Sequence, residues 1–177
     1  DLERILEGHP HVRPVLLDHR EDSSEVALLN HPARRQHLPC TSEAVREAGL
    51  SVVFLATPPE VSMELAPAMI SAGVKVIDLS GAFRLRTPER YQRWYKQTHT
   101  QPALLASAAY GLPELCRESI PRASLISNPG CFPTSANLAI RPLLQADVVE
   151  RGAGIVCDAK SGASGAGKKP GLKNSFG

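Results

Sequence analysis

The stretch that decides the fold runs from Ser51 to Leu79 and reads SVVFLATPPEVSMELAPAMISAGVKVIDL. Its first part, SVVFLA (51–56), is a continuous apolar run, typical of a strand buried on both faces of a parallel sheet. Apolar residues at helical spacing then predict a helix over 61–72, which Gly73 closes. The run VKVIDL (74–79) predicts a second strand. Strand, helix and strand with short joints form a βαβ unit, which is right-handed by default.

Segments on both sides extend this alternation. Pro67 is expected to kink the central helix unless it falls in the first turn, because an internal proline removes a hydrogen-bond donor. The other predicted elements are a strand at 12–17, mostly loop at 21–44, a helix at 88–96, a strand at 124–127, a helix at 134–144 and a strand at 154–159. The alternation predicts an α/β fold with a Rossmann-like, largely parallel, doubly wound sheet.

The composition fits a packed globular protein of 177 residues, with 42% hydrophobic and 21% charged residues. The formal net charge of +2 suggests neither nucleic acid nor an anionic membrane surface as a partner. No apolar run approaches the ~20 residues that a membrane-spanning helix needs. The four cysteines contain no C-x-x-C pair, so no metal site is signalled and free thiols in a reducing compartment are expected.

Polar or small residues follow each predicted strand, at the end where parallel sheets bind their ligands. Such loops are also common in α/β proteins that bind nothing there, yet five in one sheet favour a ligand site. The five loops are DHRED (18–22), TPPEVS (57–62), SGAFR (80–84), NPGCFPT (128–134) and KSGASGAG (160–167).

Cys131 stands in an unusually stiff segment, SNPGCFPT (127–134). Pro129-Gly130 breaks the preceding strand, and Pro133-Thr134 fits the first turn of the next helix. The sulfur is thus expected at a helix N-terminus, where free N–H groups and the helix dipole favour a thiolate. A thiolate is the nucleophile that acyl transfer needs. The alternative, a buried inert thiol, is expected for Cys157, Cys40 and Cys116.

Two further loops suggest cofactor contacts. The small residues of SGASGAG (161–167) let backbone N–H groups approach an anion, although such a segment can also be a flexible linker. After the first strand, Arg20 suits the 2′-phosphate of NADP, whereas Asp18 suits the ribose hydroxyl of NAD. We expect NADP bound through Arg20; a solvated loop charge is the alternative.

Taken together, SNPGCFPTSANLAIRPLL (127–144) and DAKSGASGAGKKP (158–170) resemble the N-acetyl-γ-glutamyl-phosphate reductase family. VVFLATPPEVSMELAP, VKVIDLSGAFRL and YGLPEL resemble the same family in the same order. The resemblance implies NADPH-dependent reduction of N-acetyl-γ-glutamyl phosphate to N-acetyl-L-glutamate 5-semialdehyde and phosphate, a step of arginine biosynthesis, through a thioester on Cys131. It also implies a cytoplasmic homo-oligomer, either a dimer or a tetramer.

The resemblance assigns residues 1–128 to an incomplete NADP-binding Rossmann-like domain and 129–177 to the start of an α+β catalytic and dimerisation domain. The resemblance also implies that Ser80 and Arg84 border the substrate; the Arg84 fork suits a carboxylate or phosphate, and an ordinary salt bridge is the alternative. The Asn128 side chain, or the amides at the helix start, is expected to stabilise the oxyanion. The expected cofactor residues are Arg20, Pro58, Ser62, Ser161, Gly162, Ser164 and Gly165.

The sequence departs from the family pattern at Asp18 and His19, and two family features are not seen in it. A glycine-rich phosphate loop is expected before Asp1, and the acid–base histidine after Gly177, so we expect an internal piece that is inactive alone. All six histidines are expected at the surface. The alternatives are a related semialdehyde dehydrogenase of the aminoadipate or aspartate branch, or a non-catalytic cofactor-binding fragment.

Overall fold

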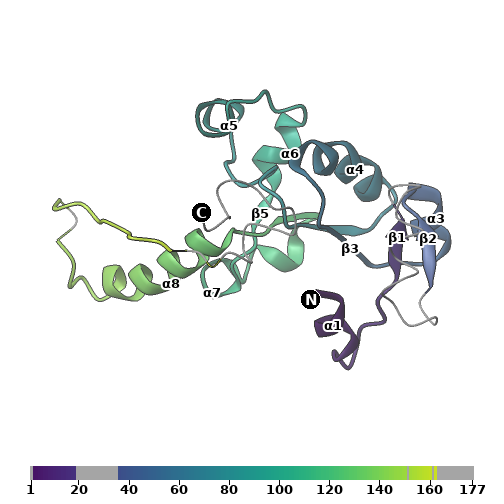
Figure 1. Cartoon of the computed structure of the whole chain (residues 1–177), viewed down its shortest axis with the longest axis horizontal. Coiled ribbons are helices and arrows are strands. Elements are labelled where there is room, and N and C mark those ends of the chain that lie inside the picture. The colour runs from purple at the N-terminus through teal and green to yellow at the C-terminus, as the bar shows by residue number, and fades with distance from the viewer. Residues whose placement is uncertain (1, 19–35, 151, 161, 163–177) are drawn as a thin grey trace, which may run out of the picture. The chain divides into compact units, whose positions relative to one another are not determined.

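A computed structural model describes residues 2–18, 36–150, 152–160 and 162 (Figure 1). The chain divides into two compact units, Asp1–Pro129 and Gly130–Gly177. In chain order the elements are α1 (Leu2–Glu7), β1 (Leu16–Asp18), β2 (His37–Pro39), α3 (Ser42–Glu47), β3 (Val52–Leu55), α4 (Pro59–Ser71), β4 (Lys75–Asp78), α5 (Pro88–Tyr95), α6 (Pro102–Ser107), β5 (Ala109–Tyr110), α7 (Pro113–Cys116), the 3₁₀ helix η1 (Ile120–Arg122), β6 (Leu125–Ser127) and α8 (Cys131–Gln145).

The first unit contains a four-stranded sheet in the order β3-β4-β6-β5 and a two-stranded sheet, β1-β2. Every strand pair in the described residues is parallel, which confirms the predicted α/β class. The predicted βαβ unit is present as β3, α4 and β4, and Gly73 follows the helix with a φ of 87°. A positive φ costs glycine least, which explains why the helix ends there.

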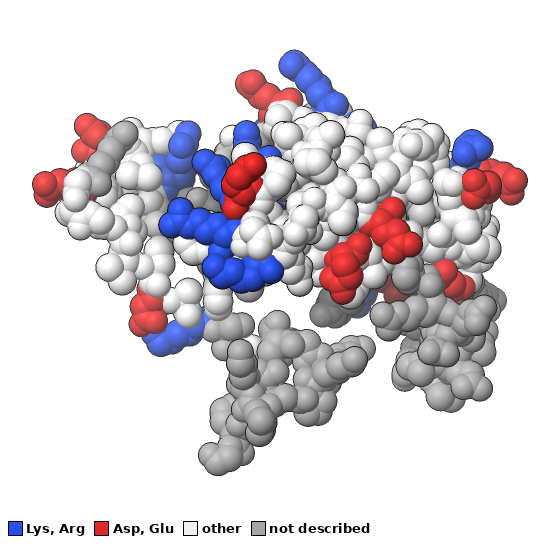
Figure 2. All heavy atoms as spheres, turned by 90° about the horizontal axis from the view of Figure 1, so that it is seen from above, with Lys and Arg blue, Asp and Glu red and all other residues white. Residues whose placement is uncertain are grey.

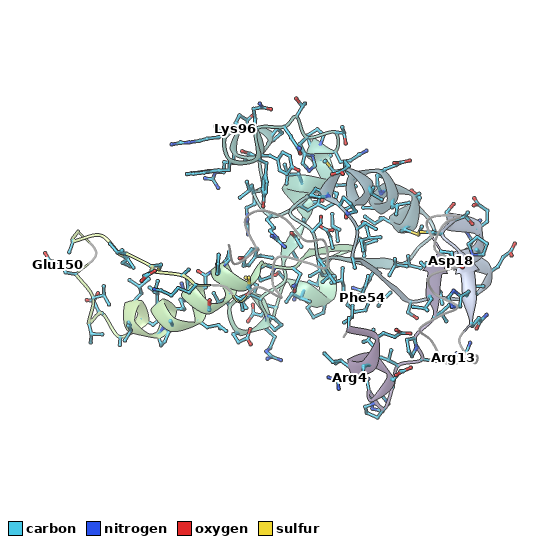
Figure 3. All side chains as sticks on the ribbon, viewed as in Figure 1. Arg4, Arg13, Asp18, Phe54, Lys96 and Glu150 are labelled. Carbon is cyan, nitrogen blue, oxygen red and sulfur yellow. The ribbon has the colours of Figure 1, made fainter. Side chains whose placement is uncertain are left out.

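The core of this unit lies between the four-stranded sheet and α4 (Figure 1). Val53 and Leu55 of β3 are 3% and 2% exposed and belong to the same core cluster as Met63 and Met69 of α4. Val52 is 40% exposed. The prediction that β3 is buried on both faces is therefore wrong: only alternate residues of β3 are fully buried, and β3 ends the strand order of its sheet. Phe54, partly buried, points from the other face of the strand (Figure 3).

The helix predicted at 61–72 differs slightly at both ends from the helix in the structure. The helix α4 begins at Pro59, two residues before the expected start, because proline is favoured in the first turn. It continues through Pro67 to Ser71 as one helix. Packing against the sheet outweighs the one hydrogen bond that Pro67 cannot make.

The N-terminal region holds more regular structure than predicted. The first strand is only Leu16–Asp18, since Pro14 cannot donate to a sheet. Within the segment predicted as loop, β2 pairs with β1, and α3 begins after Thr41, whose hydroxyl accepts from the Ala44 N–H at 3.2 Å. The prediction of mostly loop at 21–44 is therefore wrong at 37–39 and 42–47, where β2 ends at Pro39 and α3 follows it.

In the second unit, α8 begins at Cys131, three residues earlier than predicted. The strand predicted at 154–159 is wrong: these residues form no regular structure, and Val156 is 96% exposed. An apolar run becomes a strand only when a neighbouring strand accepts its backbone hydrogen bonds, and none of the described residues pairs with it.

Acidic and basic side chains both occur on the face that Figure 2 presents, in keeping with a net charge of +2. Within the described ranges, no helix is long and apolar enough to cross a membrane.

Candidate functional site

The carboxyl ends of four parallel strands form one edge of the sheet in register. Leu55 pairs with Asp78, Asp78 with Ser127, and Ser127 with Tyr110. The hydrogen-bond ladder continues one residue further, because Asn128 N donates to Asp78 O at 2.8 Å. We call this row the carboxyl edge; three of the five predicted loops leave from it, namely TPPEVS, SGAFR and the start of NPGCFPT. The prediction of five such loops in one sheet is wrong, because β1 belongs to the two-stranded sheet and residues 154–159 form no strand before KSGASGAG.

Asp78 at this edge is fully buried and organises the next turn, Ser80–Arg84. One carboxylate oxygen accepts from the backbone N–H of Ser80 at 3.1 Å, and the other accepts from the Ser80 hydroxyl at 2.9 Å. The Ser80 oxygen in turn accepts from the Ala82 N–H at 3.0 Å. Ser80 is therefore part of the turn's internal hydrogen bonding. Sequence reasoning missed Asp78, although an acid that ends an apolar strand is a signal for such a role.

Arg84 joins two strand ends. Its Nε–H donates to the carbonyl oxygen of Asn128 and its Nη2–H to that of Leu79, both at 2.9 Å. The guanidinium has five donors, so three N–H groups remain beyond these two bonds. Arg84 is thus fixed in place while keeping donors for an anionic group.

Asn128 leaves β6 at the carboxyl edge and is partly buried. Its side-chain Nδ2 donates to the Pro129 carbonyl at 3.2 Å. The neighbouring residue Ser127 is 1% exposed, and its hydroxyl has no hydrogen-bond partner among the described residues. A buried polar group without a partner is costly.

Gly111 brings β5 close to this point. A Cβ there would lie 2.9 Å from Ile126 Cγ2 and 3.2 Å from Asn128 Cα, so glycine allows the close backbone approach. Burial raises the pKa of the adjacent Tyr110, while the nearby charge of Arg84 lowers it. Tyr110 is therefore a neutral phenol near Arg84.

The two cofactor residues predicted after β3 differ in exposure. Pro58 is exposed and precedes α4, which has no side-chain cap on its first turn. Ser62 is fully buried, and its hydroxyl lies 2.9 Å from that of Thr57. Ser62 is thus connected to the start of the TPPEVS loop through the hydrogen bond between its hydroxyl and that of Thr57.

The expectation that all histidines lie at the surface is wrong for His99, which is 5% exposed. Its Nε2 lies 2.9 Å from the Ala82 carbonyl, and its Nδ1 accepts from the Gln101 N–H at 3.0 Å. The ring contacts Phe83 and Tyr91. Burial lowers the pKa of His99, against the opposing effect of the bond to Ala82. Sequence reasoning missed it because no motif marked this position.

Cys131, in the second unit, is exposed and is the first residue of the 15-residue helix α8. Gly130 is the N-cap and no side chain caps the helix, so N–H groups of the first turn stay available. The Thr134 hydroxyl donates to the Gly130 carbonyl at 2.9 Å, which fixes the first turn. The predicted position of the sulfur at a helix start is confirmed.

The other thiols divide differently from the prediction. Cys40 and Cys116 are partly buried, and burial raises the pKa of Cys40. Cys157 is exposed, so the prediction that it is buried in a strand is wrong, since no strand forms there. In the part of the chain that the structure describes, no group of three or more His, Cys, Asp and Glu side chains is placed to hold a metal ion.

The predicted cofactor residues at the ends of the chain are only partly described. Asp18 ends β1 (Figure 3), and its Oδ1 lies 3.0 Å from Nδ1 of His37 in β2. Gly162 is exposed. Arg20, Ser161, Ser164 and Gly165 lie outside the described residues.

Comparison with known proteins finds two family models that match this chain. Residues 1–123 match the model of the semialdehyde dehydrogenase NAD-binding domain, and residues 131–177 match that of the semialdehyde dehydrogenase dimerisation domain. A structure of aspartate semialdehyde dehydrogenase II from Vibrio cholerae aligns at 23% identity over 64% of this chain and 30% of that one. The TM-score of this alignment is 0.42.

Curated relatives are similar over almost the whole chain. N-acetyl-γ-glutamyl-phosphate reductases from Symbiobacterium thermophilum, Bacillus mycoides and Thiobacillus denitrificans are 46%, 44% and 43% identical to it. The alignments cover 95%, 96% and 96% of this chain and 49%, 50% and 50% of those relatives, so the chain spans about half their length. Because a family model matches more than half of its residues, the chain belongs to the semialdehyde dehydrogenase family.

Proposed function

We propose that the complete protein carrying this chain reduces N-acetyl-γ-glutamyl phosphate to N-acetyl-L-glutamate 5-semialdehyde and phosphate, with NADPH as the reductant. The observation that carries the proposal is Cys131, an exposed thiol at the first position of α8 and three residues after the carboxyl edge in the chain. Curated relatives that share 41–46% of residues with the chain bear the name of this reductase. The reaction places the protein in arginine biosynthesis.

Cys131 acts as the nucleophile in this proposal. Its thiolate attacks the acyl carbon, the bond from that carbon to the phosphate oxygen breaks, and a thioester remains on the sulfur. NADPH, when bound, supplies the hydride that reduces this thioester. Hydride addition leaves a thiohemiacetal oxyanion, whose collapse breaks the carbon–sulfur bond, releases the aldehyde and restores the Cys131 thiolate.

Three residues of the first unit serve the substrate. The free donors of Arg84 suit a phosphate or carboxylate, because a guanidinium binds either in a bidentate manner. The Asn128 amide, or the free N–H groups at the start of α8, would stabilise the developing oxyanion. Ser80 shapes the turn that carries Arg84.

A nicotinamide cofactor fits the residues present. The carboxyl edge of a parallel sheet is the usual place for it, and the loops TPPEVS and SGAFR leave from that edge. We assign contacts with the cofactor to Pro58 and, through Thr57, to Ser62. Phosphate contacts are assigned to Ser161, Gly162, Ser164 and Gly165, and the choice of NADP to Arg20.

We infer that residues 1–128 serve the cofactor and residues 129–177 begin the catalytic and dimerisation domain. The match of residues 131–177 to a dimerisation model supports a homo-oligomer, which we take to be a dimer or tetramer. We propose the cytoplasm as its location, to be tested by cell fractionation.

The experiment is a substrate panel on the complete protein. In the reverse direction, phosphate-dependent reduction of NADP is measured with N-acetylglutamate semialdehyde, aspartate semialdehyde and the aminoadipate analogue. The proposal predicts the highest kcat/KM for N-acetylglutamate semialdehyde. A preference for aspartate semialdehyde or the aminoadipate analogue would identify the protein as a semialdehyde dehydrogenase of the aspartate or aminoadipate branch. Cofactor binding without turnover of any of the three substrates would refute a catalytic role.

A further inference from the structure

We infer that His99 is a positioning residue for the Ser80–Arg84 turn, and so for the substrate contacts that the turn carries. The inference rests on the proposed function for its consequence in catalysis, but its structural part stands on the hydrogen bonds of the first unit alone. Nothing in the sequence motifs pointed to this histidine.

The hydrogen bonds fix the tautomer of the His99 ring. A backbone N–H only donates and a carbonyl only accepts, so the bond from Gln101 N leaves Nδ1 without a proton. Nε2 therefore carries the proton and donates it to the Ala82 carbonyl at 2.9 Å. Both ring nitrogens thus form hydrogen bonds with backbone groups, and only the neutral ring can form both, because a protonated ring has no acceptor nitrogen.

The ring is held rigidly. Phe83 and Tyr91 contact it edge to face, with ring centroids 5.4 and 4.8 Å away, and both are almost fully buried. Ala82, whose carbonyl receives the bond, has no exposed surface. His99 thus fixes the middle of the turn from a segment 17 residues further along the chain.

The turn is held at three points. Asp78 holds its beginning through Ser80, and Arg84 holds its end through Leu79 and Asn128. The bond from His99 to Ala82 holds the middle, where no other side chain of the described residues is recorded bonding to the carbonyl. Without this bond, the buried Ala82 carbonyl accepts no hydrogen bond from a side chain of the described residues. The part of the turn that leads to Arg84 then loses one constraint.

The test uses three substitutions in the complete protein. His99→Gln keeps an N–H donor near the position of Nε2. His99→Asn is too short to reach Ala82 but keeps an acceptor near Nδ1. His99→Leu removes both bonds and keeps an apolar side chain, and His11→Gln, at an exposed position, is the control.

The first measurement is hydrogen–deuterium exchange of peptides covering 80–85, with β3 as the internal reference. We expect faster exchange at 80–85 in His99→Leu and His99→Asn, near wild-type exchange in His99→Gln and His11→Gln, and unchanged exchange in β3. Should His99→Leu not fold, the Gln and Asn variants carry the comparison. A uniform loss of protection that includes β3, or a Gln variant that behaves like Asn, would overturn the inference.

The second measurement is the KM for inorganic phosphate in the reverse reaction. We expect it to rise about two- to tenfold in His99→Asn, as for the loss of one hydrogen bond, with kcat changed less and with recovery in His99→Gln. An unchanged KM with a loosened turn would refute the link to substrate contacts. If the wild type has no activity, the proposed function fails, while the exchange data still decide whether His99 fixes the turn.

Discussion

Arg84 and Asn128, which are 44 residues apart in the chain, are joined by a 2.9 Å hydrogen bond from the guanidinium Nε to the backbone carbonyl. The same guanidinium bonds to the Leu79 carbonyl, so one side chain links the loops that leave β4 and β6. Asn128 opens the Asn-Pro-Gly segment that leads to Cys131. The arginine therefore has a structural task besides any contact with substrate.

Arg84→Lys tests that double task. Lysine keeps the charge but lacks the planar fork that reaches two carbonyls. We expect a loss of about 1.5–3 kcal/mol in the free energy of unfolding, the usual value of a charge-assisted hydrogen bond, and a higher KM for phosphate. Thermal unfolding and reverse-direction kinetics of the complete protein measure the two effects. Arg86→Lys, at an exposed position, is the control; equal effects of the two substitutions would show that the bridge contributes nothing.

His99 gives a pH dependence of stability. Burial lowers its pKa below the ordinary value of 6.5 in the folded protein, so the unfolded chain binds the proton more readily. The stability that the neutral ring contributes is present above about pH 6.5 and is lost as the pH falls through the folded pKa. We expect the wild type to lose more stability between neutral and mildly acidic pH than His99→Gln does. Parallel curves for the two proteins would contradict this.

The fold was predictable from the sequence where local pattern and packing agree. The run SVVFLA, the helix that Gly73 ends and VKVIDL each contribute residues to the core, so their apolar pattern was enough to predict these elements. The prediction failed where pairing partners decide. The residues of GIVCDA pair with no strand in the described chain, and β2 exists because β1 lies beside it.

The site was predictable in part for the same reason. Cys131 and Asn128 stand in a motif whose prolines and glycine dictate the local backbone, and the helix start followed from it. Asp78 and His99 act through contacts with the Ser80–Arg84 turn. The contact of His99 with Ala82 joins residues far apart in sequence, and no local pattern encodes it.

Cofactor choice can be tested at Arg20 and Asp18. If Arg20 holds the 2′-phosphate, Arg20→Ala raises the KM for NADPH relative to that for NADH about tenfold to a hundredfold, as expected for the loss of a charge-assisted contact. Asp18 lies 3.0 Å from His37, so Asp18→Asn is expected to leave the NADPH/NADH ratio nearly unchanged. Steady-state kinetics with both cofactors decide the question. An NADPH/NADH ratio that changes in Asp18→Asn but not in Arg20→Ala would show that Asp18 determines the cofactor preference.

The reactivity of the thiols distinguishes the effect of a helix N-terminus from the effect of solvent exposure alone. Cys131 and Cys157 are both exposed, but only Cys131 begins a helix in the described chain. We expect iodoacetamide to alkylate Cys131 first at neutral pH, before Cys157 and well before the partly buried Cys40 and Cys116, because the helix N-terminus favours the thiolate. Peptide mapping after brief labelling measures the order. Equal rates at Cys131 and Cys157 would show that exposure alone sets reactivity.

The central claim is that Cys131 forms a thioester with the acyl group of an acyl phosphate. The most direct measurement is the intact mass of the complete protein after mixing with N-acetyl-γ-glutamyl phosphate in the absence of NADPH, followed by peptide mapping. The account predicts release of phosphate together with an N-acetylglutamyl adduct on Cys131 that disappears when NADPH is added, and no adduct in Cys131→Ser. An adduct on another residue, or reduction of the substrate by the Cys131→Ser protein, would contradict it.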